Sequence, residues 1–248
     1  MSIEKISGVA FSALDEFSGV AKASIANVSG VTATPPFITT NLRNRYTPSN
    51  YSGSGNWLDE VGSIDLIING ATYSSTQPAN FDSDGVNDDI VSAGYTQQNT
   101  DMSWGLWFNQ DPNPASPVIN GGYTINNGRG SITYQVNGRM GQYYLGSNGS
   151  LYSPTSYVTP SSAWVYMCWS RNASTKRIQM WMFDSTGVTQ IVNAIGPDQT
   201  TANNSLVFTS PLVYRYKGKH GEYHLYEDDL STADWTQNFN ALKGYYGL

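Results

Sequence analysis

Residues 164–170, WVYMCWS, and residues 177–183, RIQMWMF, decide the fold of this chain. In the second stretch, aliphatic and thioether side chains alternate with Gln179, Trp181 and Phe183. Successive side chains of a strand point to opposite faces, so both faces of this strand are predicted to be covered. We therefore expect a central strand of a two-sheet sandwich and not an edge strand.

Runs of the same kind fill the chain from Phe37 onward, separated by turn signals about every 8 to 15 residues. Only 13% of the residues are charged, while Gly (24), Tyr (17) and Trp (7) are abundant. This composition suits short strands joined by polar turns, and we predict an all-β fold. The further expected strands are SIDLIING (63–70), SWGLWFN (103–109), SITYQV (131–136), QYYLG (142–146), TQIVNAI (189–195), SLVFT (205–209) and EYHLYE (222–227).

A single helix is expected, over residues 231–243 near the C-terminus. Ser231 is suited to the N-cap, Asp234 lies in the first turn, and Gly244 follows the last turn. The acidic run at 227–229 precedes this helix, and we expect it to cap the helix.

Charge and cysteine content exclude several classes of protein. The net charge is −6 and the pI is near 4.7, with no cluster of Lys and Arg, which argues against a nucleic-acid partner. The single Cys168 excludes an intramolecular disulfide and a multi-cysteine zinc site, and we expect it to be a buried strand thiol. No continuous apolar segment is present, so we expect neither a signal peptide nor a membrane span.

The first 31 residues contain a repeat. An apolar residue followed by Ser-Gly-Val recurs every 11 residues, at Ile6, Phe17 and Val28. One such unit cannot bury its own apolar side chains, so we expect it to dock on another protein or on copies of itself; an unstructured leader is the alternative. The docking residues predicted are Ile6, Val9, Phe17, Val20, Val28 and Val31. The run Thr34–Pro35–Pro36 then predicts a linker, which divides the chain into residues 1–36 and residues 37–248.

Several motifs in the second part resemble one known family. They are YTPSNYSGSGNWLDEVGSIDLIINGATYSS (46–75), FDSDGVNDDI (81–90), MSWGLWF (102–108), residues 163–183, and the ending GEYHLYEDDLSTADWTQNFNALKGYYGL (221–248). Together they resemble the concanavalin A-like (laminin G-like) jelly-roll domain of bacteriophage structural proteins, over residues 41–248. Asp89 departs from the family pattern, which has an aromatic residue there. The N-terminal repeat resembles segments of marine and cyanobacterial phage virion proteins.

The resemblance implies a two-sheet antiparallel jelly roll and a place in a virion. It leads us to expect a non-enzymatic structural protein, attached to other virion proteins through its N-terminal repeat and present as a homo-oligomer such as a trimer. Capsid decoration or head fibre and tail or baseplate component are both open. The alternative is a tail-fibre protein that binds host surface glycan; a glycan depolymerase is the third reading.

An acidic loop is the candidate metal site. Asp82, Asp84, Asp88 and Asp89 place four carboxylates within eight residues, and calcium prefers such oxygen ligands. The loop lacks the spacing of an EF-hand. A calcium site at Asp82, Asp84 and Asp88 and a solvated turn are both open.

Tyrosines crowd residues 120–157, among Asn, Ser and Gly. Aromatic rings with polar surroundings suit a sugar or a protein partner, while the alternative is that they line the core. The glycan-binding candidates are Tyr123, Tyr143, Tyr144 and Tyr152.

The sequence offers little for catalysis or zinc. A glycosidase needs two carboxyl groups facing each other across a cleft, and no E-x-D-x-x-E strand pattern is present. Asp82, Glu222 and Glu227 are the carboxylates to test. His220 and His224 lie on one expected strand, where they point the same way about 13 Å apart, so zinc is not expected.

Overall fold

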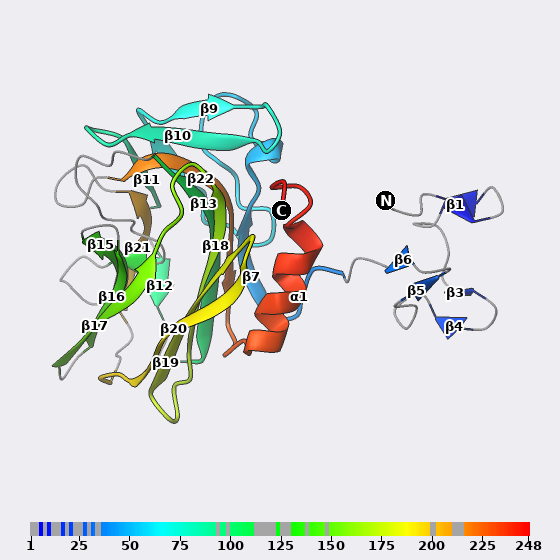
Figure 1. Cartoon of the computed structure of the whole chain (residues 1–248). Helices are drawn as coiled ribbons and strands as arrows, with labels where there is room; N and C mark the ends of the chain where they lie inside the picture. The colour runs from blue at the N-terminus through cyan, green and yellow to red at the C-terminus, as the bar shows by residue number, and fades with distance from the viewer. Residues whose placement is uncertain are drawn as a thin grey trace.

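The computed structural model describes residues 36–92, 95–97, 100–111, 123–124, 130–136, 139–146, 149–198, 202–209 and 216–248, together with six two-residue strands before residue 33. From residue 37 onward the described chain is a β-sandwich of antiparallel strands with one helix against it (Figure 1). The predicted all-β sandwich with a short C-terminal helix is confirmed.

An eight-stranded sheet forms the first layer. Its order is β20–β19–β18–β13–β22–β10–β9, and β7 also pairs with β22. The strands are β7 (Leu42–Tyr46), β9 (Thr72–Ser74), β10 (Asn80–Asp84), β13 (Met102–Gln110), β18 (Trp164–Arg171), β19 (Arg177–Asp184), β20 (Gly187–Ile195) and β22 (Lys217–Tyr226). The strand β19, from the RIQMWMF stretch, pairs on both sides, so the prediction that it is not an edge strand is confirmed.

The remaining strands lie over the other face of this sheet, away from the helix (Figure 1). One group has the order β12–β21–β11–β8 with β14 paired to β21, and a second has the order β15–β16–β17. They are β8 (Ile67–Asn69), β11 (Asp89–Val91), β12 (Tyr95–Gln97), β14 (Tyr123–Thr124), β15 (Gly130–Val136), β16 (Arg139–Gly146), β17 (Gly149–Val158) and β21 (Ala202–Thr209). A 3-10 turn, Pro48–Asn50, follows β7.

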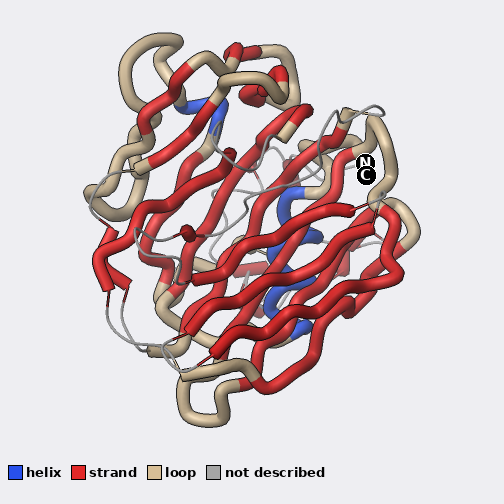
Figure 2. Tube along the Cα trace, turned by 90° about the vertical axis from the view of Figure 1, so that its left-hand side faces the viewer, coloured by secondary structure: helices blue, strands red, loops and turns tan. Residues whose placement is uncertain are grey.

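Alternation along the central strands produces two separate cores. On β18, Val165, Met167 and Trp169 belong to the core between the two layers. Tyr166 and Cys168 of the same strand belong to a second core, beneath the helix. The thiol of Cys168 is buried there, as predicted. Both faces of the sheet are thus covered, one by strands and the other by the helix, which Figure 2 shows crossing behind the strands.

The helix α1 (Thr232–Leu242) begins as the sequence predicts. Ser231 is its N-cap, and a reciprocal capping box joins Ser231 to Asp234. The acidic run before the helix does not cap it, contrary to expectation. Glu227 forms an ion pair with Arg43 at 2.7 Å instead, because the chain turns back beside β7 before the helix starts.

The N-terminal repeat forms three short antiparallel pairs: β1 (Lys5–Ile6) with β2 (Val9–Ala10), β3 (Glu16–Phe17) with β4 (Val20–Ala21), and β5 (Asn27–Val28) with β6 (Val31–Thr32). Among the described residues, no helix is long and apolar enough to cross a membrane.

Candidate functional site

The glycan-binding tyrosines lie on neighbouring strands of the layer opposite α1. Tyr143 of β16 pairs directly with Tyr152 of β17, and Tyr144 pairs with Leu151. Tyr123 lies on β14, which pairs with β21 and contacts β15. The fold therefore places the four positions on β14, β16 and β17, which β15 joins; β15, β16 and β17 lie on the left in Figure 1. Their side chains lie outside the part of the chain that the structure describes.

Tyr157, at the end of β17, shows how this region is joined to the large sheet. Its hydroxyl donates a hydrogen bond to the Asp184 carboxylate at 2.8 Å. Burial alone would raise the pKa of Asp184, but the hydrogen bonds from Thr186 and Tyr157 outweigh it and lower that pKa. Tyr157 packs against the core between the layers, so for this tyrosine the alternative of a core role is the correct one.

The acidic loop is held by its own backbone. The Asp84 carboxylate accepts a hydrogen bond from the amide of Val86, and the Asp88 carboxylate accepts one from the amide of Asp84 at 2.7 Å. Asp82 and Asp84 are exposed, whereas Asp88 is 7% exposed. Burial is the main cause that raises the pKa of Asp88. The described residues contain no group of three His, Cys, Asp or Glu side chains placed to hold a metal, so calcium binding stays a prediction.

A buried ionic cluster lies under the α1 face, which sequence reasoning did not foresee. Glu222, 3% exposed, accepts a hydrogen bond from Arg45 Nε at 2.6 Å and lies 2.8 Å from His224 Nε2. Burial favours the neutral form of Glu222, but His224 and Arg45 outweigh it and lower its pKa. Alternation within EYHLYE is the signal that could have placed Glu222 and His224 on one face.

The two histidines do not point the same way, contrary to expectation. The register between β13 and β22 shifts between Leu106 and Phe108, which inserts one extra residue into β22. As a result the His220 ring packs against Tyr216 of the core between the layers, with 4.5 Å between the ring centroids. The His224 ring meets Phe37, on the helix side, at 4.5 Å. Burial lowers the pKa of His220 to about 3.

The docking residues occupy matched positions in the three N-terminal pairs. Ile6 pairs with Val9, Phe17 with Val20, and Val28 with Val31. The 11-residue repeat in sequence is thus also a repeat of backbone pairing. Whether these residues bind another protein is not tested by the structure and stays a prediction.

Asp59 is a further organising residue that sequence reasoning missed. Its carboxylate accepts backbone hydrogen bonds from Arg45, Val61 and Gly62 at 3.0–3.1 Å. It also bonds the amide side chain of Asn44. These contacts fix the loop after Trp57.

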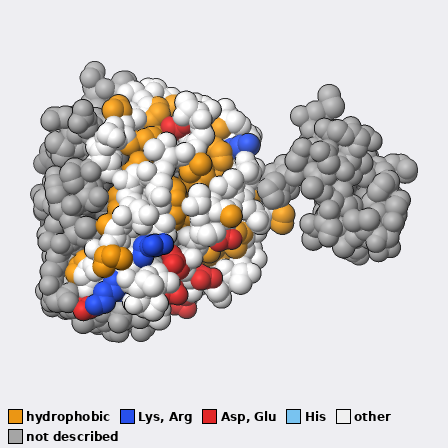
Figure 3. Space-filling model, turned by 60° about the horizontal axis from the view of Figure 1, so that its bottom comes forward, with side chains coloured by type: hydrophobic (Ala, Val, Ile, Leu, Met, Phe, Trp, Pro, Cys, Tyr) orange, Lys and Arg blue, Asp and Glu red, His pale blue; other side chains and the backbone are white. Residues whose placement is uncertain are grey.

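The described side chains on the face shown in Figure 3 carry little concentrated charge. The face shown in Figure 3 consists mainly of uncharged polar side chains and backbone, with acidic and basic groups in small clusters. That face offers no basic track of the kind that follows a phosphate backbone.

Comparison with known proteins identifies the fold. No family model and no curated protein matches the chain. Among solved structures, domain 4 of the arabinanase AbnA from Geobacillus stearothermophilus, in complex with arabinotriose, is 14% identical, with a TM-score of 0.62 over 81% of this chain and 98% of that one. Trypanosoma rangeli sialidase is 12% identical, with a TM-score of 0.60 over 90% of this chain and 36% of that one. The binding domain of botulinum neurotoxin DC, in complex with SialylT, is 10% identical, with a TM-score of 0.59 over 82% of this chain and 52% of that one.

The chain is therefore a concanavalin A-like β-sandwich. It spans about a third of the sialidase and about half of the neurotoxin domain. At these identities the likeness shows the fold alone, and none of these three matches bears on the expected place in a virion.

Proposed function

We propose that this chain is a non-enzymatic, tethered carbohydrate-binding module. The observation that carries the proposal is its likeness to domain 4 of the arabinanase, whose full length it matches and which was solved with arabinotriose. The four tyrosine positions lie on β14, β16 and β17 of one layer, and aromatic rings among polar residues suit a sugar partner.

The carboxylates suggested for catalysis favour binding over cleavage. Glu222 is 3% exposed and held by Arg45 and His224, so it cannot reach a substrate. Glu227 is engaged with Arg43. Asp82 is exposed on β10, where its backbone lies opposite Lys219 of β22. A glycosidase needs two carboxyl groups flanking one bond, so the burial of Glu222 is what supports a binding role for this set.

The setting that we propose is a bacteriophage virion. The N-terminal repeat would attach several copies to the particle, so that weak contacts with host glycan add up through avidity. Support comes from the sequence resemblance and from the three matched pairs of the repeat. Capsid decoration without sugar binding is the competing role, favoured by the same repeat.

Two measurements test the proposal. Binding of the full chain to an array of glycans, including arabinose and sialic acid oligosaccharides, should show saturable binding to at least one class without release of sugar. Gold-labelled antibody against residues 37–248 should label phage particles. Label on the tail supports host recognition, label over the head with no glycan bound supports decoration, and absence of label contradicts the virion setting.

A further inference from the structure

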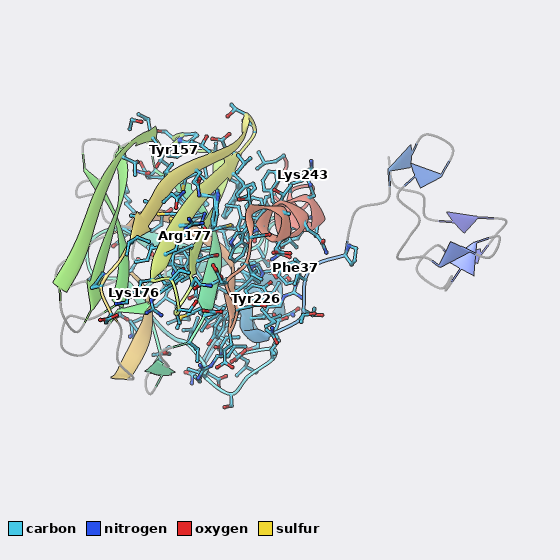
Figure 4. All side chains as sticks on the ribbon, turned by 90° about the horizontal axis from the view of Figure 1, so that it is seen from below. Phe37, Tyr157, Lys176, Arg177, Tyr226 and Lys243 are labelled. Atoms are coloured by element: carbon cyan, nitrogen blue, oxygen red, sulfur yellow. The ribbon has the colours of Figure 1, made fainter. Side chains whose placement is uncertain are left out.

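The chain enters the sandwich through residues 36–38, and side chains of β7, β22 and α1 contact this short segment. The ring of Phe37 lies 4.5 Å from the His224 ring, and the guanidinium carbon of Arg45 lies 4.8 Å from the Phe37 ring. Phe37 and Tyr226 both lie on the α1 side of the sheet (Figure 4). Phe37 thus covers the buried Glu222–His224 pair from outside.

Both backbone polar groups of Ile38 are held in a closed ring of hydrogen bonds. The amide of Ile38 donates to Asn238 Oδ1 at 2.9 Å, and Asn238 Nδ2 donates to the Tyr226 hydroxyl at 3.0 Å. The Tyr226 hydroxyl in turn donates to the carbonyl of Ile38 at 3.0 Å. Two residues earlier along the chain, the carbonyl of Pro36 accepts a hydrogen bond from Gln237 at 2.8 Å.

The groups that hold Ile38 are completely buried. They belong to Asn238 and Tyr226, and Asn238 comes from α1, which packs into the core beneath the sheet. Tyr226 ends β22, which pairs with β7, β10 and β13. If Ile38 moved away, the buried side-chain amide of Asn238 would lose a hydrogen-bond partner, which would lower the stability of the folded chain.

We infer that residues 36–38 form an anchor that fixes where the N-terminal segment leaves the domain. The segment departs on the α1 face, opposite the layer that carries Tyr143 and Tyr152 (Figure 4). A force applied to the N-terminal segment would therefore act on α1 through Asn238 and on β22, inside the large sheet, through Tyr226. The consequence for display rests on the proposed function: the exit point of the chain, at residue 36, lies on the face opposite the tyrosine-bearing layer.

The anchor is tested by a distance measurement on the full chain that involves neither sugar nor particle. Spin labels are attached through Thr34→Cys and Gln190→Cys, the second on the exposed strand β20. Cys168 stays unlabelled because it is fully buried. Pulsed electron resonance then gives the width of the distance distribution for the parent, for Asn238→Ala and for Phe37→Ala.

Asn238→Ala removes the acceptor of the Ile38 amide, and Phe37→Ala removes the ring that packs on His224. Each variant therefore loses part of the anchor, and the distance distribution should be broader than the parent's in both. Thr236→Ala is the matched control on α1, since its hydroxyl bonds only the carbonyl of Thr232.

Equal widths in the parent, Asn238→Ala and Phe37→Ala would overturn the anchor. Should Asn238→Ala fail to fold, Phe37→Ala decides alone, since Phe37 lies at the surface of the core. A failure of glycan binding or particle labelling leaves this width unchanged, so the anchor and the proposed function fail separately.

Discussion

Tyr143 and Tyr152 are directly opposite each other in the antiparallel pair of β16 and β17. Opposite residues in such a pair are cross-strand neighbours, so one sugar can meet both positions. We expect Tyr143→Ala and Tyr152→Ala each to weaken binding of the recognised glycan about tenfold, equivalent to about 1.4 kcal/mol. Titration calorimetry with the glycan identified on the array measures this.

The double variant should lose less than the product of the two single losses, because neighbouring residues share one ligand. Thr155→Ala, on the same strand β17, is the control and should bind as the parent does. Unchanged affinity in both single variants would remove the pair from the site.

Removal of residues 1–33 separates tether from domain. The sandwich begins its core contacts at Phe37, and both its cores draw on residues from 37 onward. We therefore expect the shortened chain to remain folded and to bind glycan with the affinity of the parent, yet to be absent from assembled particles. Immunoblots of purified particles check this, and normal incorporation of the shortened chain would contradict the docking role of the repeat.

Ser170 joins α1 to the sheet. Its hydroxyl accepts a hydrogen bond from Trp235 Nε1 at 2.9 Å and donates one to the carbonyl of Leu230 at 2.8 Å. All three residues are buried. The Ser103 hydroxyl also donates to Ser170 Oγ, at 2.8 Å, so Ser170→Ala leaves three buried polar groups without this partner. We expect a loss of about 3 kcal/mol in the free energy of unfolding.

Urea denaturation measures that loss. Ser174→Ala is the control, because Ser174 is exposed and bonds only the nearby Asn172. It should change stability by less than about 0.5 kcal/mol. Equal stability of the two variants would show that the Ser170 contacts contribute nothing.

How far the sequence predicts the fold is clearest on β19 and β22. The alternation in RIQMWMF correctly gave a strand covered on both faces, because burial on two sides leaves a strong periodic signal. The same rule failed for His220 and His224, since a bulge in β22 changes the face of every residue beyond it. A bulge depends on the partner strand, so one strand's sequence does not reveal it.

The candidate site was predictable only as a region. Tyrosines crowded between turn signals indicated neighbouring strands, and the register of β16 and β17 bears that out for Tyr143 and Tyr152. The Ile38 ring with Asn238 and Tyr226 was beyond reach, because it joins residues about 200 positions apart along the chain. The QNFNALKG motif (237–244) is part of the resemblance to the jelly-roll family, and its Asn238 bonds Ile38 and Tyr226 in the structure.

His220 gives the clearest dependence of stability on pH. Its folded pKa is lowered to about 3 by burial, whereas the unfolded value is about 6.5. Between these values the unfolded chain holds a proton that the folded chain lacks, so stability rises with pH. Above about pH 6.5 the titration of His220 leaves the free energy of unfolding unchanged. As the pH falls from there toward 3, this free energy decreases by about 1.4 kcal/mol per pH unit.

His220→Gln removes this titration while keeping a polar side chain of similar size. We expect the variant's unfolding free energy, measured in urea at several pH values between about 4 and 6, to rise less steeply with pH than the parent's, by about 1.4 kcal/mol per unit. Thr189→Ala, on the exposed edge of β20, should keep the parent slope. Carboxylates such as Asp88 titrate in both proteins and cancel in the comparison. Parallel slopes for parent and His220→Gln would mean that His220 takes up its proton in the folded state as readily as in the unfolded chain.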